Sequence, residues 1–325
     1  MANYQYSADL VNDVLFRVGE PTDGTSDFES AALQYLNRAY QIIWTGGGEF
    51  DETLNEEWWW LQKRPPGVLT LQPKIVAGTV QVTNGSASLT FSSAPDPALD
   101  ASTASGWFFR VQDHPDVFRV STHASGAVAA TLDSVYTGPT ATAKSYVLAK
   151  LEYPLATDVL RMFSPMRVAQ ESRNEIEGRS LTSLDRDYPL RLIQGGVPRA
   201  FAPVGERAVR FSHTGGASGT KLIRAEYDYL RRPADLTDSG SEEPLVPQPY
   251  RKVLADMAAF YVFLDKNDGR AEGAGKLAQG GLRAMAREQR RRQQITARTN
   301  GQIIPRPDQL RRIEVPRTES GLILG

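Results

Sequence analysis

A glycine-rich stretch towards the carboxyl-terminal end is the first segment whose residues could do chemistry. Residues 269–276 read GRAEGAGK, which at a glance matches a loop that holds nucleotide phosphates. Such a loop requires Gly-x-x-x-x-Gly-Lys followed by Ser or Thr, with a strand before it. Here Arg270 stands at the position of the first glycine, and Leu277 stands where the hydroxyl residue is needed. A phosphate-binding loop is therefore not expected.

Other patterns for catalysis or metal binding are also missing from the sequence. The chain has no cysteine, which excludes disulfides, thiolate metal sites and cysteine nucleophiles. His114, His123 and His213 lie far apart, without the spacing that would bring two of them to one metal ion. The carboxylates of residues 51–57 are expected to form a solvated face, because nothing indicates a dry pocket around them. We therefore expect neither enzyme activity nor a cofactor.

A run of arginines near the end of the last predicted helix is the strongest local charge feature. It comprises Arg283, Arg287, Arg290, Arg291 and Arg292, and only Glu288 opposes it locally. One interpretation is structural, since cations suit a helix carboxyl terminus and charge runs often face solvent. The other is a contact with an acidic protein surface or with DNA phosphates. The two interpretations remain open at this stage.

Residues 299–325 predict an extended arm. Isolated apolar residues alternate with arginines, and three prolines break any helical or strand period. About 27 extended residues reach roughly 80–90 Å, enough to cross a neighbouring subunit. The residues expected to dock on a partner are Ile303, Ile304, Arg306, Leu310, Arg311, Arg312, Ile313, Val315, Leu322, Ile323 and Leu324.

Three consecutive tryptophans, at positions 58–60, cannot all face one core from a single element. The favoured interpretation is that two of them pack at a junction between helix and sheet, and that one covers a seam between subunits. The alternative is a platform that stacks on sugar rings, because exposed indoles bind flat apolar ligands well.

Composition limits the classes of fold and function that the chain can have. Of 325 residues, 41% are hydrophobic and 23% are charged, so the chain can bury a core. The net charge of −1 gives no whole-chain argument for tight nucleic-acid binding. The polar amino-terminal segment predicts no secretion signal, and no apolar run approaches the roughly 18 residues that span a bilayer.

Hydrophobic periodicity predicts helices at both ends of the chain and strands between them. Residues 7–45 and 250–297 carry apolar stripes of helical period. Gly273, Gly275, Gly280 and Gly281 each cost helix stability, so they indicate either close helix packing or a break near Gly280.

The period changes to two from residue 78 onward. Asn84-Gly85 predicts a hairpin in which Val82 faces Ala87 and Val80 faces Leu89. The predicted fold is α+β. A helical bundle formed by both chain ends (1–62 and 245–298) carries an inserted antiparallel β-sandwich or barrel-like domain (68–150), a β-rich region joined to the core (151–244), and an extended arm (299–325).

The ends of the chain resemble phage head-to-tail adaptor proteins, the connectors of short-tailed and related phages. The likeness covers about residues 1–62 and 151–297, with 68–150 similar to a β domain that some members carry. The segments that carry it, in order along the chain, are 8–20, 37–40, 58–60, 153–158, 195–201, 227–237 and 244–250.

This resemblance implies a structural protein of the virion neck, assembled in the host cytoplasm. Family members form a ring, commonly of twelve subunits, beneath the portal protein. The helical cores surround a channel through which DNA passes with transient, non-specific contact. The carboxyl-terminal arm reaches the portal, and the β parts meet a tail or nozzle protein. No membrane partner is implied.

Two other classes remain as alternatives. A tail-associated carbohydrate-binding or spike protein would bind a glycan through Trp107 or through residues 58–60. A capsid-associated hydrolase would cleave wall or polysaccharide by means of a carboxylate.

Overall fold

The protein is an α+β molecule whose chain divides into two compact units, seen in a computed structural model. The helical unit contains the residues up to Leu61 and those from Pro233 onward, and the β unit contains Gln62–Arg232. The structure describes residues 4–24, 27–96, 99, 106–169, 174–189, 191–216, 222–237 and 240–299, with the backbone alone for residues 294–299.

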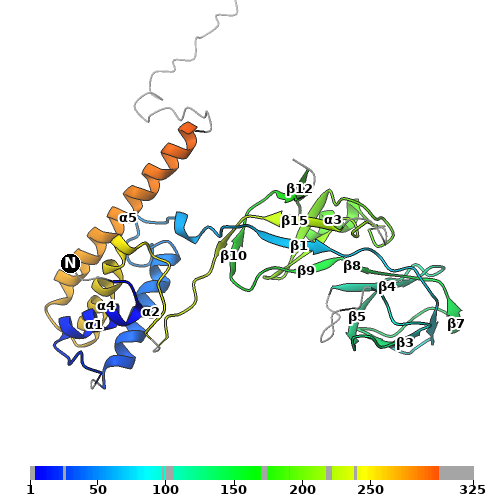
Figure 1. Ribbon diagram of the computed structural model, residues 1–325, viewed down its shortest axis with the longest axis horizontal. Coiled ribbons are helices and arrows are strands. Elements are labelled where there is room, and N and C mark those ends of the chain that lie inside the picture. The colour runs from blue at the N-terminus through cyan, green and yellow to red at the C-terminus, as the bar shows by residue number, and fades with distance from the viewer. Residues whose placement is uncertain are drawn as a thin grey trace, which may run out of the picture. The chain divides into compact units, whose positions relative to one another are not determined.

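Four α-helices build the helical unit, two from each end of the chain (Figure 1). The central one, α4 (Lys252–Asp265), packs against the other three and is buried along most of its length. Those three are α1 (Ser7–Val18), α2 (Glu29–Trp44) and α5 (Ala271–Thr299). Short 3₁₀ turns at Trp59–Leu61 and Gln248–Tyr250 complete the unit. Within the described residues, no helix is both long and apolar enough to cross a membrane.

Helix α5 continues past all four of its glycines, so the break considered near Gly280 does not occur. Two of the glycines lie at close approaches to α4. A Cβ at Gly275 would come within 3.1 Å of the Phe260 ring, and one at Gly281 would lie 2.5 Å from Val253. A side chain at Gly281 would force Val253 to shift, and one at Gly275 would press on the Phe260 ring, so both glycines allow a close approach of the two helices.

A buried arginine joins the two chain ends within the helical unit. The Arg251 guanidinium donates to the Gln5 and Tyr4 carbonyls at 2.7 and 3.1 Å, and to the Val246 and Pro244 carbonyls at 2.8 and 3.0 Å. It also pairs with the Glu243 carboxylate at 2.7 Å. One side chain therefore fixes the amino-terminal segment against the segment that enters α4.

The segment that enters α4 lies along the helical unit, so this unit begins at Pro233 and not at the expected residue 245. Leu236 is buried, and its backbone makes two hydrogen bonds with the Asn37 amide, each 2.8 Å long. The Leu245 N–H donates to the Tyr40 hydroxyl at 2.9 Å. The described residues between 233 and 244 form no strand, although the expected bounds of the β-rich region included them.

The β unit contains two seven-stranded sheets and a strand pair. The first sheet runs in the order β1-β15-β11-β12-β13-β14-β9, and the helix α3 (Leu181–Asp187) contacts β13. Its strands are β1 (Gly67–Leu71), β9 (Glu152–Pro154), β11 (Met166–Val168), β12 (Glu175–Gly178), β13 (Ala200–Val204), β14 (Ala208–Phe211) and β15 (Ile223–Tyr227). The separate pair is β10 (Val159–Met162) with β16 (Tyr229–Arg231).

The second sheet is antiparallel throughout and curls around a core of its own, in the order β7-β2-β3-β6-β5-β4-β8. Aromatic residues Phe91, Trp107, Phe109 and Tyr146 fill that core. Its strands are β2 (Val80–Val82), β3 (Ser88–Phe91), β4 (Trp107–Val111), β5 (Phe118–His123), β6 (Ala129–Leu132), β7 (Ala141–Lys144) and β8 (Tyr146–Lys150). Residues 68–71, expected in this inserted part, belong to β1 and pair with β15 in the first sheet.

The hairpin at Asn84-Gly85 forms, but the predicted register is wrong by two residues. Val82 lies opposite Leu89, and Val80 lies opposite Phe91. The backbone after the turn bonds elsewhere, since the Gly85 N–H donates to the Tyr136 carbonyl and the Tyr136 N–H donates to the Ser86 carbonyl, each at 2.9 Å. A slip of two residues keeps the valines on the buried face, so the apolar pattern alone could not detect it.

We predict that Arg251→Ala lowers the free energy of unfolding by about 3–5 kcal/mol, because it leaves four buried or partly buried backbone carbonyls without a donor. Urea unfolding followed by circular dichroism measures the change. Lys252→Ala, at the adjacent exposed position, is the control and should stay within about 0.5 kcal/mol of the parent. Equal effects of the two substitutions would show that Arg251 does not join the chain ends.

Candidate functional site

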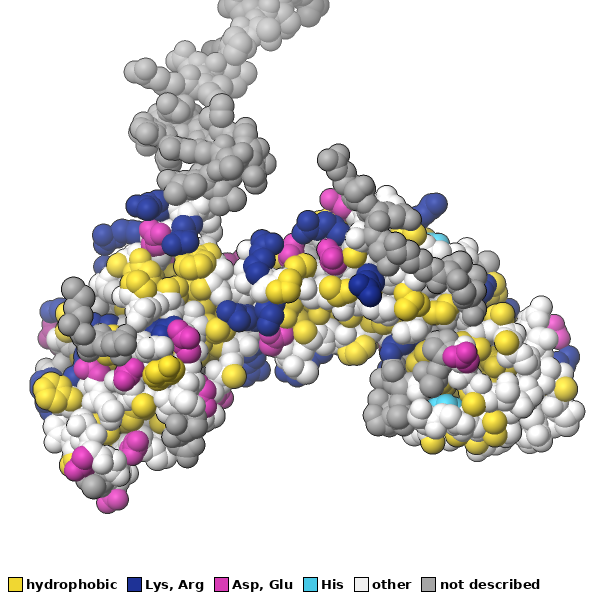
Figure 2. Space-filling view, in the orientation of Figure 1, with side chains coloured by type: hydrophobic (Ala, Val, Ile, Leu, Met, Phe, Trp, Pro, Cys, Tyr) yellow, Lys and Arg dark blue, Asp and Glu magenta, His cyan; other side chains and the backbone are white. Residues whose placement is uncertain are grey.

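The arginine run lies on the second half of α5, and its members differ in their surroundings. Figure 2 shows Lys and Arg side chains gathered over this part of the helix. The opposite face of α5 is apolar and buried, with Ala278, Leu282 and Met285 turned towards the rest of the helical unit. The arginines therefore lie on or beside the exposed face, and their acidic neighbours decide which of them can bind a partner.

Arg283 is held by a buried carboxylate. Its Nε lies 2.8 Å from the Asp51 carboxylate, whose other oxygen accepts from the Thr53 hydroxyl and N–H at 2.6 and 3.1 Å. These hydrogen bonds, from Thr53 first and Arg283 second, lower the pKa of Asp51 to about 2. The expectation that residues 51–57 form a solvated acidic face is thus wrong for Asp51, because its burial is compensated by fixed donors.

Arg290 is paired in the same manner. Its Nε and one terminal nitrogen both donate to one Glu56 oxygen, at 2.9 and 2.8 Å, and the Glu56 side chain is only 10% exposed. Arg283 and Arg290 thus connect α5 to residues 51–57. Their contacts lie within the subunit and need no partner.

The tryptophan segment is attached to α5 by a buried amide. The Gln289 amide accepts from the Trp59 N–H at 2.9 Å and donates to the Glu57 carbonyl at 2.7 Å. Trp58 and Trp60 are buried and stack on each other with ring centroids 6.5 Å apart. Trp59 is 39% exposed and carries the Arg292 guanidinium 4.1 Å above its ring. Two of the three indoles therefore pack in the interior, and Arg292 covers one face of the third; the expected seam between subunits stays a prediction.

The remaining arginines are the outward-facing ones. Arg291 and Arg292 share Glu288, at 3.4 and 2.9 Å. Arg287 is exposed and makes no ion pair within the part of the chain that the structure describes. Arg287 is thus the member of the run whose charge is free for a partner. The predicted docking residues Ile303, Ile304, Arg306, Leu310, Arg311, Arg312, Ile313, Val315, Leu322, Ile323 and Leu324 lie outside the described residues.

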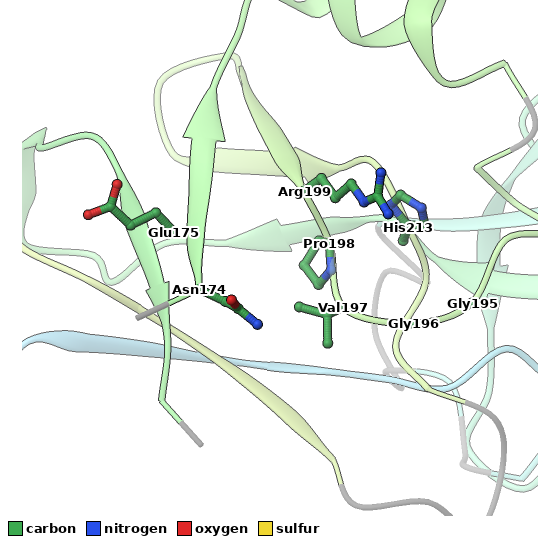
Figure 3. Close-up of a pocket in the computed structure, with 8 residues that line it drawn as sticks. All are labelled: Asn174, Glu175, Gly195, Gly196, Val197, Pro198, Arg199 and His213. Carbon is green, nitrogen blue, oxygen red and sulfur yellow. The ribbon is translucent and has the colours of Figure 1, made fainter. Parts of the chain in front are cut away.

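A second polar feature, which the sequence analysis did not single out as a site, lies in the β unit. A cavity of about 500 Å³ is lined by Asn174 and Glu175, by the loop 195–199 and by His213 (Figure 3). The loop is part of the segment that resembles the adaptor family, which was the one sequence signal available for it. No cluster of metal-ligating side chains occurs among the described residues.

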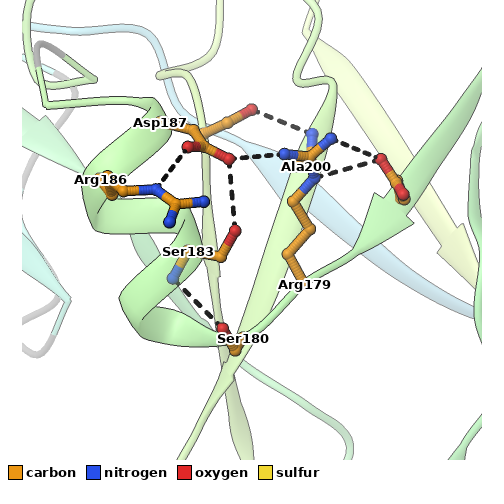
Figure 4. Close-up of polar contacts among 8 residues, drawn as sticks. Arg179, Ser180, Ser183, Arg186, Asp187 and Ala200 are labelled. Carbon is orange, nitrogen blue, oxygen red and sulfur yellow. Dashed lines mark hydrogen bonds and ion pairs between the residues drawn. The ribbon is translucent and has the colours of Figure 1, made fainter.

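The polar network around Arg179 is saturated with internal contacts (Figure 4). Arg179 pairs with Glu177 at 2.8 Å and with Asp187 at 2.7 Å, while Asp187 also accepts from Arg186. Ser180 caps α3 by accepting from the Ser183 N–H at 3.2 Å. Every charged group in this network has a partner, so its role is to hold α3 on the sheet.

Comparison with known proteins gives no family assignment. No protein-family model matches this chain, and no curated protein matches it. The geometry of the two units and of the α5 surface therefore carries the functional argument.

We predict that Arg283→Ala destabilises the protein by about 1–3 kcal/mol, since a buried carboxylate loses a charged donor. Arg287→Ala, on the same helix and equally basic, is the matched control and should change stability by less than about 0.5 kcal/mol. Chemical unfolding of both variants measures the difference. Similar losses in the two variants would mean that Arg287 has a structural partner as well.

The Asp51 carboxylate also predicts a pH dependence. Its folded pKa of about 2 lies below the ordinary value of 3.8, so its stabilisation is complete above about pH 4 and is lost as pH falls towards 2. Asp51→Asn should be less stable at pH 7 and should lose less stability on acidification than the parent protein. Unfolding curves recorded across this pH range test it, and parallel pH profiles would contradict the assignment.

Proposed function

We propose that the protein is a head-to-tail adaptor of a phage virion, a structural subunit that forms a ring under the portal and links the capsid to the tail. The observation that carries the proposal is the way the chain is divided. Both chain ends build the helical unit, and the β unit is inserted between Leu61 and Pro233. In this proposal the helical unit is the adaptor's helical bundle, and the β unit meets the tail or nozzle protein.

The charges on α5 suit a surface that DNA passes without being held. Three carboxylates pair with four of the five arginines, so a net charge of +2 remains for the cluster. Each phosphate neutralised by a protein cation adds to affinity through counterion release, and a few contacts give weak, salt-sensitive binding. We propose that Arg287 and Arg291 meet either the passing DNA or an acidic portal surface.

The arm 299–325 completes the proposal. Its first residue, Thr299, is the last residue of α5, and its arginines and apolar residues suit a partner with acidic and apolar patches. A ring of twelve such arms would bind a portal ring by multiple weak attachments, which raises the overall affinity without strengthening any single contact. The ring would be assembled in the host cytoplasm and would then lie at the neck of the virion.

The tryptophans that the carbohydrate-binding alternative would use are mostly buried or covered. Trp58, Trp60 and Trp107 are buried, and the Arg292 guanidinium lies over the Trp59 ring. The indoles that the sequence offered for stacking on a sugar are therefore less accessible than an open platform would be.

Electron microscopy of the purified full chain, alone and mixed with the portal protein of the same virus, tests the proposal. We expect closed rings with a central channel, either alone or once the portal is added, and stacking of the two rings. A protein that stays monomeric and does not bind the portal under both conditions would overturn the adaptor assignment.

The contribution of the arm and of Arg287 can be separated with variants. A chain ending at Arg298 should remain folded but lose co-assembly with the portal. Arg287→Glu should slow association at low salt and change little at high salt, because exposed charges act mainly through steering. Lys252→Glu makes the same charge change on α4 and serves as the control. Unchanged portal affinity of the truncated chain would assign docking to the helical unit.

A further inference from the structure

The cavity beside the loop 195–199 contains a histidine whose protonation is fixed by its neighbours. The Ser212 side chain is fully buried, and its Oγ accepts hydrogen bonds from the Arg199 and Ala200 N–H groups, each at 3.1 Å. A hydroxyl has two acceptor lone pairs and one proton, so these two bonds use its acceptor capacity. Its own proton can then only be donated, and the acceptor in reach is His213 Nδ1 at 2.9 Å.

This hydrogen bond determines the tautomer of His213. Because Nδ1 accepts, the ring proton of the neutral imidazole lies on Nε2. A protonated ring would bring a third donor to the Ser212 oxygen, which has no lone pair left for it. Burial first, and the positive charge of Arg199 second, lower the pKa of His213. At neutral pH the ring is therefore an uncharged donor, and its Nε2–H has no hydrogen-bond partner within the described residues.

Arg199 supplies a positive charge next to this donor. Its guanidinium lies beside His213 in Figure 3, and its side chain is exposed. No hydrogen bond or ion pair of this guanidinium occurs in the part of the chain that is described. The nearest acidic residue of the lining, Glu175, directs its carboxylate away from Arg199. By contrast, Arg179, directly after β12, and Arg210, on β14, are each paired with carboxylates.

The lining therefore combines one unpaired cation, one fixed neutral donor and an apolar wall made by Val197 and Pro198. We propose that this pocket binds a carboxylate, with the Arg199 guanidinium and His213 Nε2–H as its two donors. A guanidinium fork matches the geometry of a carboxylate. A single positive charge, with Glu175 on the rim, suits a singly charged ligand better than a phosphate dianion. The site is independent of the adaptor role.

Histidine-selective labelling of the full chain tests the proposal, with propionate as the probe. The chain has three histidines, so ¹⁵N-histidine spectra contain few signals. We expect the spectrum at neutral pH to show His213 with an unprotonated Nδ1 and a protonated Nε2. Propionate should shift the Nε2 signal of His213 and leave His114 and His123 unchanged. The latter two also report whether each variant is folded.

Two substitutions and a competing anion decide the outcome. Arg199→Ala should raise the Kd for propionate at least about ten-fold, because a charge-assisted hydrogen bond is lost. The control Arg207→Ala, at an exposed position in the turn after β13, should leave the Kd unchanged. Ser212→Ala should give a mixture of His213 tautomers and a higher His213 pKa. Binding that is insensitive to Arg199→Ala, a His213 signal that propionate does not move, or tighter binding of inorganic phosphate than of propionate would overturn the proposal.

Discussion

The helical unit depends on one buried guanidinium. Arg251 donates to carbonyls from the first described residues of the chain and from the segment that enters α4, and it pairs with Glu243. Burying a positive charge is costly unless its donors are all used, so the folded unit tolerates Arg251 only when both chain ends are in position. The two ends are separated along the chain by the entire β unit, so these contacts are long-range ones that only the folded unit can make.

The difference between local and long-range contacts also explains which parts of the fold were predictable from the sequence. The four helices of the helical unit follow from apolar periodicity, since burial selects the residues that face a core, whereas α3 lies in a stretch that was expected to be β-rich. The register of the Asn84-Gly85 hairpin does not follow from this periodicity, because a shift of two residues leaves the same side chains buried and the deciding hydrogen bonds come from Tyr136. Likewise, the position of residues 233–244 depends on Asn37 and Arg251, which no local pattern reveals.

The candidate site, like the fold, was predictable only in part from the sequence. The arginine run on α5 was visible in the sequence, but its five members were indistinguishable there. The structure separates them through Asp51 and Glu56, which lie more than two hundred residues away and take up Arg283 and Arg290. Arg287 is left facing solvent. The pocket at His213 depends on the side chain of Ser212 and two backbone N–H groups, so its chemistry is a property of the folded backbone and could not be read from residue types.

The chain passes between the two units twice. Next to each passage, within the helical unit, an amide side chain forms hydrogen bonds with the backbone of the connecting segment. Asn37 holds Leu236 by both its N–H and its carbonyl, and Gln289 holds the Trp59 N–H and the Glu57 carbonyl. Each amide thus makes two hydrogen bonds to the backbone of a connecting segment from a side chain that is anchored on a helix. A force that pulled on the β unit would therefore reach the helical unit through two separate chain segments, one held by α2 and the other by α5.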